Sequence, residues 1–265
     1  SATVHFPIWH QEIEDILVLK NNKGSEDNRV RKLDYSIQIT KLFYERFIKN
    51  EDITLFSPNN VPGLYEAFGM PEFDEMYKKY EADETIPKTT ISAQELFMDM
   101  LKERAETGRI YIMNLDHCNS HSSFKDKIYM SNLCQEITLP TIPIQHIDDK
   151  EGEIALCILS AINLGLINDI NELEELCDLS VRALDEIIDY QEYPVESAKI
   201  STQARRSLGI GYIGLAHYLA KNQVSYESKT AVKLVDKLTE AFQFYLLKAS
   251  NNLAKEKSKC LWFEK

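Results

Sequence analysis

The sequence predicts an α/β fold whose C-terminal half is rich in helices, and three observations support this class. Hydrophobic patterns of the helical and extended kinds alternate up to residue 162. A helix signal at residues 92–104 is followed directly by a short apolar strand signal at 109–115. From residue 171 onward the apolar residues recur with helical spacing. Alternation of helix and strand is typical of domains that cover a sheet with helices.

The first hundred residues contain several short elements. A charged segment at 21–31 is poor in apolar residues, and we expect an exposed loop there. Pro58, Pro62 and Gly63 separate a strand from the helices that follow it. The predicted helices are 12–19, 36–48, 64–68 and 72–80, and the predicted strand is 53–56.

The next element has clear boundaries. Ser92 and Glu95 have the spacing of a capping box that begins a helix. Gly108 is suited to end that helix in the left-handed conformation, before the strand at 109–115.

Two further strands are expected in the middle of the chain. After a polar stretch at 117–127, residues 129–139 alternate as a strand does, and Pro140 ends the pattern. The apolar run at 154–162 predicts a strand that is covered on both faces.

The C-terminal half shows three helical stripes and no repeat or Ser/Gly linker. We therefore treat residues 1–265 as a single segment without independent domains. The stripes are Leu173, Leu176, Leu184, Ile187 and Ile188; residues 210–220; and Val232, Val235, Leu238, Phe242, Tyr245, Leu246, Ala249 and Leu253.

Composition excludes several classes of protein. The chain has 30 basic and 42 acidic residues, and its net charge of −12 argues against a general nucleic-acid binder. An apolar run of about 18 residues, as a membrane span needs, is not found in the sequence. The five cysteines are odd in number and form no CxxC pair, so we expect a reducing cytoplasm.

Two motifs have competing interpretations. GIGYIG at 209–214 matches the dinucleotide fingerprint, but the preceding residues 201–208 are too polar for the buried strand that the fingerprint requires. Its glycines instead fit close helix packing. His117, Cys118 and His121 are possible zinc ligands without a second ligand pair, and the alternative is that the histidines bond to the loop backbone.

Asn132, Cys134 and Glu136 form the third constellation. On a strand, residues two apart point to the same side, so an amide, a thiol and a carboxylate share one face. If that face is solvent, this is an edge strand with an incidental cysteine. If it is interior, burying three polar groups is costly unless they are used or satisfied, which indicates a functional site.

Several motifs, in one order along the whole chain, resemble the large catalytic subunit of class I ribonucleoside-diphosphate reductase, in its bacterial and bacteriophage forms. The most extensive are SNLCQEI at 131–137 and GEIALCILSAINLG at 152–165. The others are FPIWH (6–10), LKNN (19–22), LFSP (55–58), TGRIY (107–111), DHCN (116–119), LGIG (208–211) and YLLKA (245–249).

The resemblance implies part of a ten-stranded α/β barrel in which a finger loop carries a radical cysteine, here Cys134. In this family the thiyl radical removes the ribose 3′ hydrogen. The carboxylate matching Glu136 takes the proton of the 3′-hydroxyl, and the amide matching Asn132 holds substrate oxygens. Cys157 matches one of the two cysteines that deliver electrons to the substrate, and the partner of that pair lies upstream of Ser1.

The resemblance also implies partners. These are the remaining segments of the large subunit, a metal-containing small subunit that generates the radical, thioredoxin or glutaredoxin, and a ribonucleoside diphosphate. No cofactor or metal is expected to bind this segment directly, and the allosteric ATP and deoxynucleotide sites are expected outside it. Its role is then DNA precursor synthesis in the cytoplasm, or in the host cytoplasm if the protein is viral.

Three functional hypotheses remain open. The first is that the segment supplies the radical cysteine to a larger or split reductase. The second is that it is a non-catalytic assembly fragment of a split or decayed reductase, and the third is a glycyl-radical relative. Both ends look cut, and an intein leaves Ser, Thr or Cys after its splice junction, which Ser1 fits.

Overall fold

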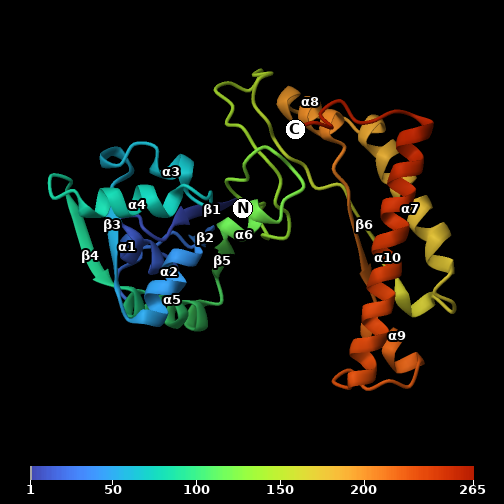
Figure 1. Cartoon of the computed structure of the whole chain (residues 1–265), viewed down its shortest axis with the longest axis horizontal. Helices are drawn as coiled ribbons and strands as arrows, with labels where there is room; N and C mark the ends of the chain where they lie inside the picture. The colour runs from blue at the N-terminus through green and yellow to red at the C-terminus, as the bar shows by residue number, and fades with distance from the viewer. Residues whose placement is uncertain (1) are drawn as a thin grey trace. The chain divides into compact units, whose positions relative to one another are not determined.

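The computed structural model describes residues 2–265 (Figure 1), so Ser1 and the splice hypothesis lie outside the described residues. The chain divides into two compact units, Ser1–Pro140 and Thr141–Lys265. Each unit buries its own apolar residues: one large cluster in the first unit, and three smaller ones in the second. That residues 1–265 act as a single segment of one larger domain stays a prediction.

A three-stranded parallel sheet lies at the centre of the first unit. Its strands are β1 (Ala2–Pro7), β2 (Leu33–Ile39) and β5 (Ile110–Asn114), in the order β1-β2-β5. Tyr35, Ile37 and Ile39 on β2 are fully buried. Parallel strands need crossover connections, and helices supply them here.

The other elements of the first unit surround this sheet (Figure 1). Strands β3 and β4 form a separate antiparallel pair. The elements are α1 (Ile13–Leu17), α2 (Lys41–Lys49), β3 (Asp52–Phe56), α3 (Leu64–Ala67), α4 (Phe73–Ala82), β4 (Lys88–Ser92), α5 (Ala93–Thr107), α6 (Leu115–Ser120) and the 3-10 helices η1 (Glu26–Asn28) and η2 (Pro58–Asn60).

The predicted boundaries of α5 are confirmed. The Ser92 hydroxyl accepts a hydrogen bond of 3.3 Å from the backbone N–H of Glu95. Gly108 ends the helix with φ of 65°, in the left-handed region that glycine enters without steric cost. The strand predicted after it is β5. The strand at 53–56, and the helices at 12–19, 64–68 and 72–80, are confirmed within a few residues at each end.

The helix predicted at 36–48 is wrong in its first part. Residues up to Ile39 belong to β2, and α2 begins only after Thr40. Ser36 and Gln38 are as fully buried as Ile37 and Ile39, so this strand has two buried faces. Periodicity of hydrophobic residues cannot distinguish such a strand from a helix.

The second unit contains a two-stranded parallel sheet and four helices. Strand β6 (Leu159–Asn163) pairs with β7 (Gly209–Ile213). The two longest helices, α7 and α10, lie side by side (Figure 1). The helices are α7 (Glu172–Tyr190), α8 (Glu196–Arg205), α9 (Leu215–Lys221), α10 (Lys229–Glu256) and the 3-10 helix η3 (Leu164–Leu166).

Two predictions for this unit are corrected. The strand predicted at 154–162 begins only at Leu159, and one of its faces is exposed, with Leu159 51% accessible. The helical stripe predicted at 210–220 is strand β7 followed by α9. The glycines of GIGYIG therefore do not serve helix packing. A Cβ on Gly209 would lie 2.5 Å from the Leu159 side chain, so glycine permits close approach of the two strands.

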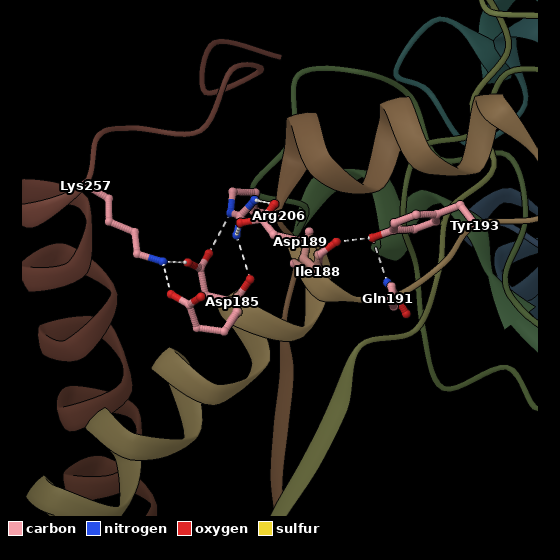
Figure 2. A network of polar contacts seen from close by, with 8 residues as sticks. Asp185, Ile188, Asp189, Gln191, Tyr193, Arg206 and Lys257 are labelled. Carbon is pink, nitrogen blue, oxygen red and sulfur yellow. Dashed lines mark hydrogen bonds and ion pairs between the residues drawn. The ribbon is translucent and has the colours of Figure 1, made fainter.

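Charged side chains connect the ends of three helices in the second unit (Figure 2). Arg206, just after α8, has a positive φ of 51°. Its Nε donates to Asp185 at 2.6 Å and its Nη1 to Asp189 at 2.9 Å. Lys257, just after α10, reaches the other oxygen of Asp185 at 2.9 Å. Arg206 and Lys257 thereby fix the start of β7 and the end of α10 against α7.

None of the helices in residues 2–265 combines the length and apolar character needed to cross a lipid bilayer.

Candidate active site

The strand predicted at residues 129–139 is wrong. The structure has an irregular loop there, with a turn at residues 133–135. The carbonyl of Asn132 accepts a 3.2 Å hydrogen bond from the backbone N–H of Gln135. Gln135 has φ of 62°, which breaks the extended conformation and the two-residue period. The shared strand face of Asn132, Cys134 and Glu136 therefore does not exist.

The turn presents the three predicted site residues differently. Cys134 and Glu136 are exposed, whereas Asn132 is half-buried. A loop at this position agrees with the finger loop that the sequence resemblance implies.

Asn132 closes the turn from within. Its Oδ1 accepts a hydrogen bond of 3.0 Å from the backbone N–H of Ile137. The Ser131 hydroxyl lies 3.2 Å from the same oxygen and also contacts the carbonyl of Ile137. Local hydrogen bonds of this kind stabilise turns that lack a strand partner. The amide of Asn132 thus has a structural function besides any chemical one.

Gln135 is the residue that sequence reasoning missed. Its Nε2 donates a 2.6 Å hydrogen bond to the carbonyl of Ile112 on β5, which connects the turn to the sheet. A glutamine between Cys134 and Glu136 carries no signal of this role in the sequence, because neither its spacing nor its type indicates a positive φ.

Cys157 lies in the second unit, two residues before β6, and is exposed. Residues on both sides of it are bonded to neighbours. The carbonyl of Ile154 accepts a 2.7 Å hydrogen bond from Ser201, and that of Ile158 accepts one of 2.9 Å from Gly209. Cys134 belongs to the first unit and Cys157 to the second, so the surroundings of each cysteine are described within its own unit.

The other three cysteines lie outside the candidate site and differ in their burial. Burial raises the pKa of Cys177, which is fully buried, to about 11. Burial also raises the pKa of Cys118, and the nearby charge of Asp116 raises it further. Neither forms appreciable thiolate at neutral pH, so both are poor nucleophiles. Cys260 is half-buried in a C-terminal loop, and none of the five cysteines forms a disulfide.

The cluster around α6 shows backbone bonding. His121 Nδ1 lies 3.1 Å from the carbonyl of His117, and the two rings pack edge to face at 5.8 Å. Cys118 packs instead against the buried residues of the first unit. In residues 2–265, no three His, Cys, Asp or Glu side chains are placed to hold a metal ion together.

Comparison with known proteins identifies the family. A family model described as ribonucleotide reductase, barrel domain, matches residues 1–265. Among the relatives, ribonucleoside-diphosphate reductase subunit alpha of Buchnera aphidicola (subsp. Schizaphis graminum) is 60% identical over 268 residues, covering 99% of this chain and 35% of the relative. Subunit alpha of reductase 1 from Escherichia coli K12 is 56% identical with the same coverage. Subunit alpha from enterobacteria phage T4 is 44% identical, over 97% of this chain and 34% of the relative.

The structure is mixed α/β with parallel strands, and its Cys134 lies between Asn132 and Glu136. Both features belong to a sequence that matches the barrel domain over its whole length. The chain belongs to the ribonucleotide reductase barrel-domain family. It spans about a third of the length of the curated relatives that it matches.

Proposed function

We propose that this chain is the part of a ribonucleoside-diphosphate reductase large subunit that carries the radical cysteine, Cys134. One observation carries the proposal: Cys134 lies at a turn with Asn132 and Glu136 two residues away on either side, in a chain that matches the reductase barrel domain over residues 1–265. A radical sulfur must reach a ribose carbon, and the accessibility of Cys134 at this turn leaves its sulfur free to do so. The relatives named as reductase subunits alpha support the reaction class.

In the proposed reaction, the Cys134 thiyl radical takes the 3′ hydrogen atom of the ribose and becomes a thiol. The Glu136 carboxylate takes the proton of the 3′-hydroxyl, which assists loss of the 2′-hydroxyl as water. The Asn132 amide holds substrate oxygens, and positioning of this kind lowers the entropic part of the barrier. Return of the hydrogen atom from Cys134 to C3′ restores the thiyl radical.

Replacement of the 2′-hydroxyl by hydrogen, with release of water, needs two electrons and two protons, and we propose that a cysteine pair supplies them. Cys157 is one member, and the other lies in a segment upstream of this chain. Two thiols become one disulfide while the ribose becomes a deoxyribose, so atoms and electrons balance. Thioredoxin or glutaredoxin then reduces the disulfide by thiol exchange. The exposure of Cys157 supports this role.

Other partners follow from the same proposal. A metal-containing small subunit supplies the radical, and the remaining segments of the large subunit complete the barrel. ATP and deoxynucleotide effectors bind to those other segments. The product serves DNA replication in the cytoplasm.

A segment graft tests the proposed function. Residues 1–265 replace the matching segment of the full-length E. coli subunit alpha, which is 56% identical. We expect the graft to form deoxynucleotides with the E. coli small subunit. Cys134→Ser should reduce turnover to background, whereas the control Cys260→Ser, at a thiol without an assigned role, should retain it.

Turnover that survives Cys134→Ser would contradict the assignment. A graft that assembles with the small subunit without any turnover would favour the non-catalytic assembly hypothesis instead.

A further inference from the structure

One face of β1 and β2 is polar and lies beneath the candidate active-site loop. In the parallel register His5 pairs with Ser36 and Pro7 pairs with Gln38, so Thr3, His5, Ser36 and Gln38 share this face. Ser36 and Gln38 are fully buried. Buried polar groups are costly unless they form hydrogen bonds, so this face needs an explanation.

Three side chains of this face donate hydrogen bonds to alternate carbonyls of the loop. Gln38 Nε2 donates to Tyr129 at 2.6 Å. His5 Nε2 lies 3.1 Å from the carbonyl of Ser131, and Thr3 Oγ1 donates to that of Leu133 at 2.7 Å. We call these the sheet-to-loop hydrogen bonds.

The tautomer of His5 follows from its partner. A carbonyl oxygen only accepts hydrogen bonds, so His5 must carry a hydrogen on Nε2. Burial lowers the pKa of His5, which keeps the ring neutral at pH 7 with Nδ1 unprotonated. All three sheet-to-loop hydrogen bonds therefore run in one direction, from side-chain donors to backbone acceptors.

The bonds stop one residue before Cys134. They fix the carbonyls of residues 129, 131 and 133, and the turn follows at once. Beyond the turn, Gln135 donates to Ile112 on the third strand of the same sheet. Cys134 is exposed to solvent, but hydrogen bonds from β1 and β2 before it and to β5 after it hold the loop in place.

We propose that Thr3, His5 and Gln38 are positioning residues for Cys134, which set the place of the radical sulfur through the loop backbone. This inference rests on the proposed function and adds to it residues that do not touch the substrate. Hydrogen bonds within the turn maintain its conformation, whereas the sheet-to-loop hydrogen bonds fix the position of the turn relative to the sheet. Their loss should therefore lower kcat more than it changes KM.

Ser36 provides a matched control. It lies on the same face and strand as Gln38 and is equally buried, but within residues 2–265 its hydroxyl has no hydrogen-bond partner. Ser36→Ala removes a polar group from the face without removing a bond to the loop.

Amide hydrogen exchange of the intact chain tests the positioning directly. In Gln38→Leu we expect the amides of residues 130–135 to exchange about fivefold faster, the effect of losing one hydrogen bond. Thr3→Val has nearly the shape of threonine and should give a similar but smaller change, whereas Thr3→Ser, which keeps the donor, and Ser36→Ala should match the wild type. If Gln38→Leu does not fold, the difference in loop exchange between Thr3→Val and Thr3→Ser shows whether the sheet-to-loop hydrogen bonds hold the loop.

Turnover of the grafted full-length subunit gives the second readout. Gln38→Leu should lower kcat about fivefold with KM changed less than twofold, as expected for one hydrogen bond. Loop exchange in Gln38→Leu and Thr3→Val that equals that of Ser36→Ala would overturn the positioning role and leave the proposed function intact. An inactive wild-type graft would refute the proposed function, while the exchange data would still decide whether the sheet holds the loop.

Discussion

Asn132 closes the turn around Cys134, and the proposed function gives the same side chain a chemical task, which a substitution can separate from the structural one. Asn132→Asp keeps an oxygen that accepts from the N–H of Ile137, so the turn should persist. It removes the amide hydrogens and adds a negative charge to the turn, so turnover of the graft should fall at least about a hundredfold, as when a transition-state hydrogen-bond donor is lost. Asn132→Ala should lose turnover and also open the turn.

Hydrogen exchange of the Ile137 amide reports the structural task and turnover reports the chemical one. An aspartate variant whose Ile137 amide exchanges as fast as that of the alanine variant would show that the oxygen of Asn132 does not close the turn.

His5 should make the stability of the first unit depend on pH. Its folded pKa lies below the ordinary value of 6.5 because it is buried. Between these two pKa values the unfolded chain binds more protons, so the free energy of unfolding decreases as pH falls through that window. We expect His5→Gln to lose less stability than the wild type between pH 7 and pH 5, measured by urea unfolding.

The exposed His146→Gln serves as the control and should follow the wild type. Equal losses in wild type and His5→Gln would show that His5 is not the group responsible.

At the scale of residues, the sequence predicted which side chains are of interest but not their directions. Asn132, Cys134 and Glu136 stood out because amide, thiol and carboxylate recur at a spacing of two. Their real arrangement depends on the positive φ of Gln135 and on its bond to β5, which is a tertiary contact. Single-sequence patterns contain no information on such a contact.

At the scale of elements, local signals predicted well and buried patterns did not. Helix α5 was found because Ser92 and Gly108 act on its own ends. Strands β2 and β7 were taken for helices, because β2 is buried on both faces and β7 runs directly into α9. Periodicity describes an element only when one of its faces meets water.

A buried ion pair joins the segment before Cys157 to the end of α8. Glu153 and Arg205, at the end of α8, approach to 2.9 Å with side chains 1% and 6% exposed. Arg205→Met leaves a buried carboxylate without its main partner, which should cost about 3–5 kcal/mol of unfolding free energy. Replacing both residues with methionine should cost distinctly less, since no charge is then left buried.

Denaturant unfolding of the two single variants and the double variant measures the coupling between them. Arg182→Met is the control, since Arg182 pairs with Asp178 and Glu256 at the exposed surface and should matter little. A double variant as unstable as the sum of the two singles would show that the pair is not coupled.

At the scale of the whole molecule, the two units differ in how completely they bury their sheets. The buried cluster of the first unit is drawn entirely from residues 8–128 and covers β2. In the second unit, Ile162 of β6 lies in the apolar core, whereas Leu159 and Ile213 are 51% and 56% exposed on the other face. Parallel sheets are normally covered on both faces. We therefore expect the stability of the second unit to depend on contacts that cover the exposed face of its sheet.

This difference predicts unequal behaviour of the separated units. Residues 1–140 should unfold in one cooperative transition and remain monomeric, whereas residues 141–265 should self-associate, as measured by analytical ultracentrifugation. If the open sheet face causes the association, Leu159→Asn with Ile213→Thr should reduce it. Leu179→Asn, on α7 and 55% exposed, should not. If all of these substitutions reduce association equally, exposed apolar area in general, rather than the sheet face, drives it. If residues 141–265 are monomeric, the exposed face of the two strands needs no cover.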